Sequence, residues 1–514
     1  MIHLLVISPI LVPLTVAALT AVLWTKPRAQ HRVVLAGMAV LFAVSALLVW
    51  VVATEGTVRT ELGDWPAPFG IVIAADHLSA AMVMVTAILA AACIVFYRSE
   101  ARIDYAYAGF FPLFCGLVVG VNGAFMTADI FNLYVWFEVM LICTLGLLVI
   151  GRTREQIDAA VKYAILNLFS TVLLLIAIGL LYGATGTLNM ADLALVLREA
   201  EATPALTVTA VLFLVAFGIK MAAFPLFFWL PASYHAAPMT VVAIFAGLLT
   251  KVGVYAALRV FTLMFEVEDG IFRDVIAWAA ALTMVTGVLG AVTQWDVRRI
   301  LSFHIISQIG YMMMGLAIAT PVAVAAAVFY IVHHIIVKAN LFLVAGAIER
   351  VGGSYDLKKL GGLMKSHPWL AVLFLIPALS LAGLPPLSGF WAKLLVIDAS
   401  FRAEDAWLAA VALAVGFLTL LSMSKIWLEA FWKAPPVPAP RRADGRRIAV
   451  PWSMAAATAF LGAITVAIGL MAEPLVRYAN VAGAELADPS GYIDRILAGA
   501  TVASGAPGGP GAAI

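Results

Sequence analysis

Residues 211–259 read VLFLVAFGIKMAAFPLFFWLPASYHAAPMTVVAIFAGLLTKVGVYAALR, and this stretch decides the fold. Two apolar runs, each long enough to cross a membrane, carry one lysine apiece, Lys220 and Lys251, and three prolines interrupt the chain between them. A lysine at bilayer depth costs several kcal/mol unless it faces water or a polar partner inside the protein. We therefore interpret both lysines as functional, with a static structural pairing as the alternative.

The composition is that of a polytopic membrane protein. Of the 514 residues, 64% are hydrophobic and 12% are charged, which excludes a soluble globular domain of this size. The three cysteines, Cys93, Cys115 and Cys143, stand singly in apolar runs, so the ligand spacing of an iron–sulfur or zinc site is missing. The sequence also lacks a Walker A loop and a GxGxxG motif. We expect this chain to bind no cofactor.

The apolar runs predict an all-α fold of about fourteen transmembrane helices, at about 20 residues per span. They cover residues 2–24, 33–53, 75–97, 106–126, 129–150, 161–183, 206–229, 237–259, 271–294, 300–317, 322–347, 367–397, 407–431 and 451–471. The seventh and twelfth spans are expected to be broken. In the twelfth, Pro385 and Pro386 remove backbone donors ahead of Lys393. Broken helices at corresponding positions are typical of inverted-repeat transporters with ion sites at the breaks.

The basic residues predict the orientation of these spans. Nineteen of the 31 fall in loops on one side, and seven, including Arg259, fall on the other. The richer side is cytoplasmic by the positive-inside rule, which puts both termini outside. Five lysines remain within the spans: Lys220, Lys251, Lys338, Lys393 and Lys425. Residues 473–514 are expected to form an outer, disordered tail.

A carboxylate is predicted at bilayer depth in the fifth span. Glu138 lies near the middle of DIFNLYVWFEVMLICTLGLLVIG. A buried carboxylate must either take up a proton or pair with a cation. Lys220 is the most plausible partner, and a static ion pair is the alternative reading of the same two residues.

The eleventh span carries a candidate proton relay in FYIVHHIIVKANLFLVAG. His334 and Lys338 are four residues apart and share a helix face with Tyr330 one turn earlier. Histidine can pass a proton through its two ring nitrogens near neutral pH. His333 points elsewhere, either as an accessory to the relay or as a packed hydrogen-bonding residue.

Other polar residues in the spans have two readings. His304 and Ser307, in SFHIISQIGYMMMG, could bridge the relay or hold neighbouring helices together by hydrogen bonds. Lys425 and Glu429, four apart in SKIWLEAFW, are expected to form a structural pair near the membrane surface, with Lys425 as an accessory of the relay as the alternative. Asp76 begins the third span, where we expect it to cap the helix.

Several motifs carry a resemblance to a known family. They are FNLYVWFEV around Glu138, GIKMAAFPLFFWLPASYHAAP around Lys220, LLTKVGVYAALR around Lys251, HIISQIGYM around His304, and LSGFWAK ending at Lys393. Across residues 75–431 the chain resembles the antiporter-like subunits shared by respiratory complex I and the multisubunit Mrp cation/proton antiporters.

The resemblance implies fourteen helices with two inverted five-helix repeats. The segments would be residues 1–105, the repeats 106–259 and 260–432, an inner loop with a last helix at 433–472, and the tail 473–514. It also implies that Glu138 and Lys220 form a pair and that Lys251 lies between two half-channels. His334 and Lys338 would lie on the polar axis that leads to an exit at Lys393.

The resemblance further implies a transporter component of a prokaryotic plasma membrane rather than an enzyme. Its partners would be the other members of an Mrp complex, including the long A-type member and the small membrane subunits, with protons and Na⁺ as the ions and no nucleic acid. The chain is too short for the A-type member or for the distal antiporter-like member of complex I. A proton-pumping component of complex I or a related hydrogenase, and an inactive scaffold, remain as alternatives.

Overall fold

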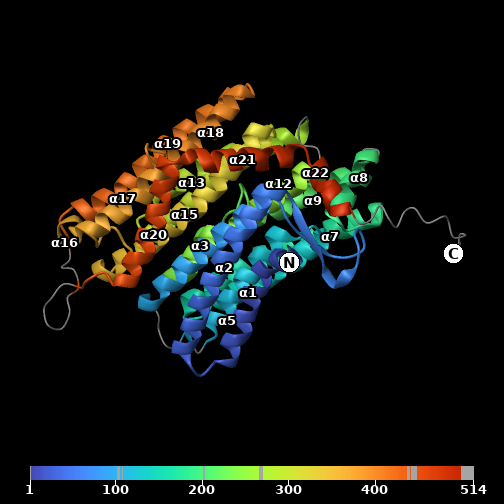
Figure 1. Ribbon diagram of the computed structural model, residues 1–514. Coiled ribbons are helices and arrows are strands. Elements are labelled where there is room, and N and C mark those ends of the chain that lie inside the picture. The colour runs from blue at the N-terminus through green and yellow to red at the C-terminus, as the bar shows by residue number, and fades with distance from the viewer. Residues whose placement is uncertain are drawn as a thin grey trace, which may run out of the picture.

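The computed structural model describes residues 2–100, 105–106, 108–200, 203–265, 270–436, 440 and 448–498, and these residues are almost entirely helical (Figure 1). The first half contains α1 (Ile2–Val22), α2 (Pro27–Glu55), β1 (Val58–Glu61), η1 (Leu62–Asp64), β2 (Val72–Ala75), α3 (His77–Glu100), α5 (Phe110–Met126), α6 (Ile130–Leu148), α7 (Arg154–Thr185), α8 (Met190–Glu199), α9 (Pro204–Met221), α10 (Trp229–Ser233), α11 (Met239–Ile244), η2 (Phe245–Leu249) and α12 (Thr250–Leu263). The second half contains α13 (Ile271–Thr293), α14 (Val297–Ile318), α15 (Pro321–Gly352), α16 (Leu363–Ser366), α17 (Pro368–Ala382), α18 (Ser388–Arg402), α19 (Ala406–Ile426), η3 (Trp427–Trp432), α20 (Trp452–Leu470), α21 (Ala472–Ala487) and α22 (Ser490–Leu497).

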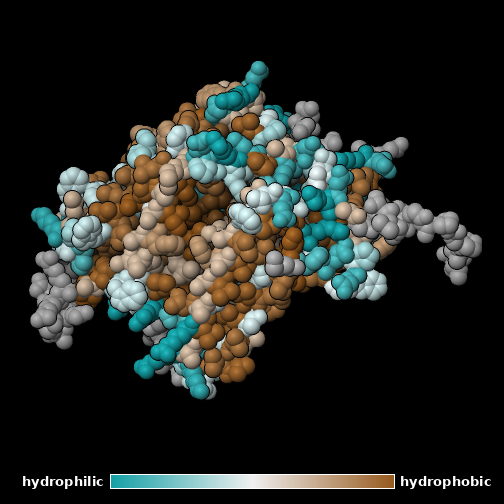
Figure 2. Space-filling view, in the orientation of Figure 1, coloured by the Kyte–Doolittle hydropathy of each residue, from teal (hydrophilic) through white to brown (hydrophobic). Residues whose placement is uncertain are grey.

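Within the described ranges, 12 helices are long and apolar enough to cross a membrane. Two shorter apolar helices, α5 and α17, accompany them. Figure 2 shows apolar side chains, in brown, covering most of the visible middle of the molecule. The all-α polytopic fold predicted from the hydropathy pattern is therefore confirmed, whereas the count of fourteen spans stays a prediction.

Both expected helix breaks are present. α9 ends at Met221, and α10 begins at Trp229 after an irregular segment. α17 ends at Ala382, and α18 begins at Ser388 after the two adjacent prolines. Proline supplies no backbone donor and closes off the preceding helix, which explains both interruptions.

Matched features in the two halves support the predicted repeat. α7 and α15 are each 32 residues long, and each is followed by a broken helix. An isolated β-bridge joins Asp129 to Asn189 after α7, and another joins Asp296 to Asp356 after α15. The side chains of Asp129 and Asp296 also cap the helices that follow them, as short acidic side chains do at helix N-termini.

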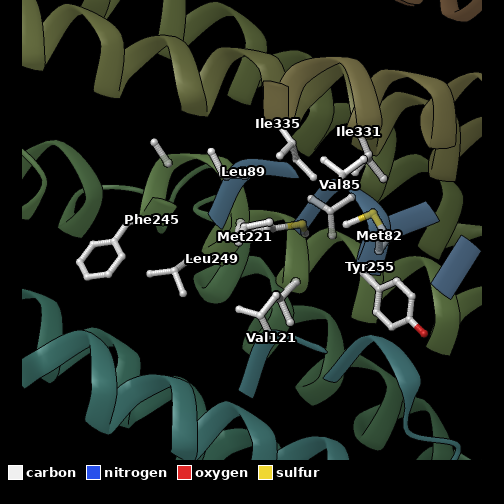
Figure 3. Packing of buried hydrophobic residues seen from close by; sticks show 14 of the residues in the cluster. Met82, Val85, Leu89, Val121, Met221, Phe245, Leu249, Tyr255, Ile331 and Ile335 are labelled. Atoms are coloured by element: carbon white, nitrogen blue, oxygen red, sulfur yellow. The ribbon is translucent and has the colours of Figure 1, made fainter. Parts of the chain in front are cut away.

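The centre of the molecule is built from helices that are buried on every side. The helical segment Met239–Leu263 is 100% buried over its most apolar stretch, and α14 and α15 are 94% buried, against 33% for α1. α3, α5, α12 and α15 meet in the apolar cluster drawn in Figure 3, where Met82, Val121, Tyr255 and Ile331 come together. The helices that carry Lys251 and Lys338, together with α14, thus form the core, while α1, α2 and α7 present apolar side chains outward.

Two features at one end of the bundle escaped sequence analysis. β1 and β2 pair antiparallel, with Val58 opposite Ala75 and Glu61 opposite Val72. The expectation of a disordered tail from residue 473 is wrong for residues 473–497, because α21 and α22 are helices that pack along α15 and against α8 (Figure 1). The last part of that prediction, residues 499–514, lies outside the described residues. α21 mixes charges with small residues, so hydropathy alone does not reveal it. The end that carries β1, β2, α8 and α22 is called the hairpin face below.

Candidate functional site

Lys220 lies at the break between α9 and α10. Its side chain is buried, and Nζ donates to the carbonyl oxygen of Asn167 at 3.3 Å and to Thr171 Oγ1 at 3.0 Å, both on α7. Nζ also lies 5.2 Å from the centre of the Phe137 ring, a favourable position for a cation. The chain leaves the helix directly after Lys220 through Ala222, which has a left-handed backbone with φ 62°.

A small cavity adjoins the Lys220 side chain. Its lining includes Tyr163, Asn167, Lys220 and Trp229, and its volume is about 20 Å³. That space holds about one water molecule, and a buried water needs two to four polar partners such as these. The break thus leaves space for about one water molecule beside the Lys220 side chain.

The direct Glu138–Lys220 pair expected from the sequence is not formed. Glu138 is half-buried on α6, and its Oε1 atom is buried with no hydrogen-bond partner among the described residues. Lys220 remains within electrostatic range of Glu138, but α7 takes up its hydrogen bonds. The structure therefore brings the two residues into one region without a contact.

Lys251 is fully buried in α12 and binds within its own helix. Its Nζ donates to the carbonyl oxygen of Ala246 at 2.6 Å. Ala246 belongs to the π-helical segment η2, and π-bulges are frequent at functional sites. Gly253, two residues further on, lets the end of α9 approach closely: a Cβ atom there would lie 2.7 Å from the Met221 nitrogen. The two lysine sites are therefore packed against each other through backbone.

α15 carries the expected polar residues into the core. Lys338 is fully buried and donates to the carbonyl oxygen of Leu301 on α14 at 3.0 Å. Both ring nitrogens of His334 are buried and lack a hydrogen-bond partner among the described residues. Tyr330 donates to Gln308 Oε1 at 2.5 Å. An unpartnered polar atom in such a site points to water between the side chains.

The accessory candidates divide into two kinds. Nε2 of His304 lies 2.9 Å from Ser422 Oγ, and its Nδ1 has no partner among the described residues. Ser307 donates to the carbonyl oxygen of Met284 at 3.0 Å and so joins α14 to α13. Nδ1 of His333 lies 2.8 Å from Ser388 Oγ at the start of α18. Ser307 has a structural contact, whereas the two histidines keep polar contacts on the side toward α18 and α19.

Lys393 lies at the second break. Its Nζ donates to the carbonyl oxygen of Ala382 at 2.9 Å, and Ala382 is the last residue of α17. The cation therefore sits at the negative end of a helix dipole. Nζ also lies 5.2 Å from the centre of the Tyr311 ring.

The expected Lys425–Glu429 pair is wrong. Lys425 donates to the carbonyl oxygens of Val292 at 2.9 Å and Gln294 at 2.5 Å, and so caps the C-terminal end of α13. Glu429 instead forms an ion pair with Lys433 at 2.6 Å. The end of α13 leaves carbonyl groups without helical partners, and a nearby lysine satisfies them.

One property unites the buried lysines Lys220, Lys251, Lys338 and Lys393. Each donates to a backbone carbonyl, and none forms an ion pair with a carboxylate among the described residues. A carbonyl dipole stabilises an ammonium group without fixing a permanent counter-charge beside it.

Sequence reasoning missed the carbonyl partners and one buried ion pair. Arg259, assigned to a loop from the charge count, is buried in α12 and forms an ion pair with Asp76. Asp76 also accepts from the Ser79 backbone N–H at 2.8 Å, so the expected capping contact is confirmed. The charge of Arg259 at the end of an apolar run looked like a loop signal, and no local pattern reveals its partner 183 residues away.

Comparison with known proteins places this geometry in a family. Residues 127–419 match the family described as NADH:quinone oxidoreductase/Mrp antiporter membrane domain. The chain is 46% identical over 495 residues to the D-type component of the Na⁺/H⁺ antiporter of Alkalihalophilus pseudofirmus, covering 96% of this chain and 99% of the relative. It is 38% identical to the D-type component of the Na⁺/H⁺ antiporter of Bacillus subtilis, covering 96% and 99%.

Solved structures agree with the sequence relatives. A chain in the Mrp complex from Dietzia sp. superposes with a TM-score of 0.89 at 35% identity, covering 96% of this chain and 99% of that one. A chain of respiratory complex I from Thermus thermophilus shares the fold, with a TM-score of 0.79 at 22% identity, covering 97% and 100%. The chain belongs to the NADH:quinone oxidoreductase/Mrp antiporter family of membrane subunits.

Proposed function

We propose that this protein is the proton-translocating subunit of a multisubunit Na⁺/proton antiporter in a bacterial plasma membrane. The observation that carries the proposal is the set of four buried lysines held by backbone carbonyls instead of carboxylates. Such lysines can alternate between charged and neutral forms. The partners in the complex are the other subunits of the Mrp type.

In the proposed route, a proton reaches Lys220 beside Glu138 and passes to Lys251. It continues along His334 and Lys338 and leaves by way of Lys393. Water bridges the gaps, which is consistent with the cavity at Lys220 and the unpartnered nitrogens of His334.

The proposed orientation puts both termini and the hairpin face outside. It rests on the excess of basic residues in the loops at the opposite end of the bundle. Selective labelling of a cysteine introduced at exposed Phe69, between β1 and β2, tests it. A membrane-impermeant reagent is expected to label this cysteine in intact cells. Labelling in inside-out vesicles alone would show that the hairpin face lies on the cytoplasmic side.

The experiment that tests the relay replaces Lys220. Lys220→Ala should abolish Na⁺-dependent proton exchange in vesicles while the complex still co-purifies, because the proton carrier at the first break is lost. Lys162→Ala is the matched control, since Lys162 is exposed on α7 and forms an ion pair with Asp158. Normal exchange in Lys220→Ala would remove the basis of the relay.

A second candidate function is proton pumping within a complex that redox partners drive. This second candidate is supported by structural similarity to chains of redox-driven complexes. One is the chain of complex I described above, and the other is a chain of an archaeal sulfane sulfur reductase, with a TM-score of 0.87 at 25% identity. Purification of the complex in mild detergent distinguishes redox-driven proton pumping from Na⁺/proton antiport. Flavin or iron–sulfur absorbance that co-elutes with this chain would support the redox function.

A further inference from the structure

The second helix break is closed by a contact between the two helices that flank it. α18 begins at Ser388, but Leu387 before it provides no side-chain cap. The first N–H groups of a helix have no partner within that helix. The N–H group of Gly389 instead donates to Ser380 Oγ on α17 at 3.1 Å. Ser380 therefore caps α18 from across the break.

A second serine and a histidine extend this contact to a third helix. Ser388 Oγ lies 3.1 Å from Ser380 Oγ, and Nδ1 of His333 on α15 lies 2.8 Å from Ser388 Oγ. All three residues are buried, and none exposes more than 2% of its surface. We call Ser380, Ser388 and His333 the clasp, because they join the end of α17, the start of α18 and the middle of α15.

A glycine allows the three helices to approach so closely. A Cβ atom at Gly389 would overlap the carbonyl oxygen of Ser380 and would lie 3.1 Å from Cε1 of the His333 ring. The backbone of α18 therefore lies directly against both residues. The Tyr330 ring packs edge-on against the imidazole, with the ring centres 5.8 Å apart. His333 thus contacts its own helix neighbour and the start of α18 at the same time.

The clasp closes the same break that Lys393 crosses. Lys393 belongs to α18, and its Nζ donates to the carbonyl oxygen of Ala382 at the end of α17. The aliphatic part of the lysine passes over Gly383, where a Cβ atom would lie 2.7 Å from Lys393 Cδ. The lysine can reach that carbonyl only while α18 stays close to α17. The clasp is the contact that keeps the two helix ends together.

We propose that His333 is a positioning residue for Lys393. By binding Ser388 it holds α18 against the end of α17, so that the lysine keeps its contact with the Ala382 carbonyl. The inference rests on the proton relay proposed above, in which Lys393 is the exit. His333 acts through the geometry of the break and does not itself carry the transported proton.

Two other roles for His333 make different demands on its side chain. A member of the relay must bind and release a proton, which among uncharged polar replacements no amide can do. A residue that only fills space needs its volume and no hydrogen bond. A positioning residue needs the hydrogen bond to Ser388 but no titration. Replacements that separate hydrogen bonding from titration therefore distinguish the three roles.

The test compares two variants of His333 in the whole complex. It measures Na⁺-dependent proton exchange in vesicles and, separately, deuterium uptake by the backbone of residues 383–392, which reports local opening of the break. His333→Leu loses one hydrogen bond, so we expect about tenfold slower maximal exchange and about tenfold faster deuterium uptake. The Na⁺ concentration for half-maximal exchange should not change. His333→Asn keeps a polar atom for Ser388 and should retain both exchange and protection.

Three further variants complete the design. Ser388→Ala removes the middle hydroxyl and should have the same two effects, which provides a second measurement if His333→Leu does not assemble. Combining the two changes should add little, because both remove the same hydrogen bond. Ser45→Ala, on a buried serine bound within α2, and His31→Leu, which removes a contact with the Ile94 carbonyl, are the controls and should change neither measurement.

Exchange and protection must change together in every clasp variant. Slow exchange in His333→Asn while residues 383–392 stay protected would overturn the proposal and identify His333 as a proton carrier. Normal exchange in His333→Leu or Ser388→Ala would also overturn it, whether or not deuterium uptake rises. Deuterium uptake requires no transport, so the clasp can be detected even if Lys220→Ala shows that the relay is wrong.

Discussion

At the scale of single residues, the nature of the lysine partners decides what the side chains can do. Lys251 is bound by the Ala246 carbonyl inside a π-helical turn, where an arginine would keep its charge permanently. We predict that Lys251→Arg assembles and loses Na⁺-dependent proton exchange by about two orders of magnitude or more. Lys425→Arg is the matched control, because Lys425 caps α13 near its end and should tolerate the exchange. Active Lys251→Arg would show that this position carries no proton.

Glu138 poses a different question, because its carboxylate approaches Lys220 without touching it. A nearby carboxylate favours the protonated form of a lysine. Glu138→Gln should therefore reduce exchange in vesicles and change its dependence on pH. Glu429→Gln, which breaks an ion pair near the end of α19, should leave the pH profile alone. An unchanged profile in Glu138→Gln would assign Glu138 a structural role.

At the scale of elements, the contact between α9 and α12 joins the two central lysines. Gly253→Ala would place a methyl group 2.7 Å from the Met221 nitrogen, and overpacking of this kind costs about 1–3 kcal/mol. We expect a lower melting temperature of the purified complex together with reduced exchange. Gly179→Ala on α7 meets nothing within 4 Å and should be neutral or stabilising by up to about 1 kcal/mol. If Gly253→Ala melted at the same temperature as the unmodified complex, the contact between α9 and α12 would not be tightly packed.

The sequence was informative wherever hydropathy and proline report on the local chain. It predicted the breaks beside Lys220 and Lys393 and the burial of Lys338, because each depends on residues within one span. It could not predict that these lysines bind carbonyls, since those carbonyls belong to other helices or to a π-turn. The proton route and the repeat stay predictions, and the direct Glu138–Lys220 pair was wrong because α7 supplies nearer partners.

At the scale of the whole molecule, the C-terminal helices join elements that are far apart in the chain. α21 buries Ala479, Ala482 and Leu486, and α22 reaches α8 and β1. A chain that stops after Leu470 should therefore melt at a lower temperature, or fail to assemble, because α3 and α15 lose their cover. A chain that stops after Ala498 is the control and should behave as the full protein does in the same thermal unfolding assay. Equal stability of the two would contradict a structural role for α21 and α22.

The carbonyl-bound lysines also have a consequence for the response to voltage. A lysine balanced by a carboxylate adds no net charge to the membrane interior, but Lys251, Lys338 and Lys393 each add one whenever they are protonated. The membrane potential acts on such a charge with about 2.3 kcal/mol per 100 mV over the full thickness. Proton occupancy of this protein should thus follow the electrical potential as well as the pH difference, so a change in voltage alone would displace charge within it.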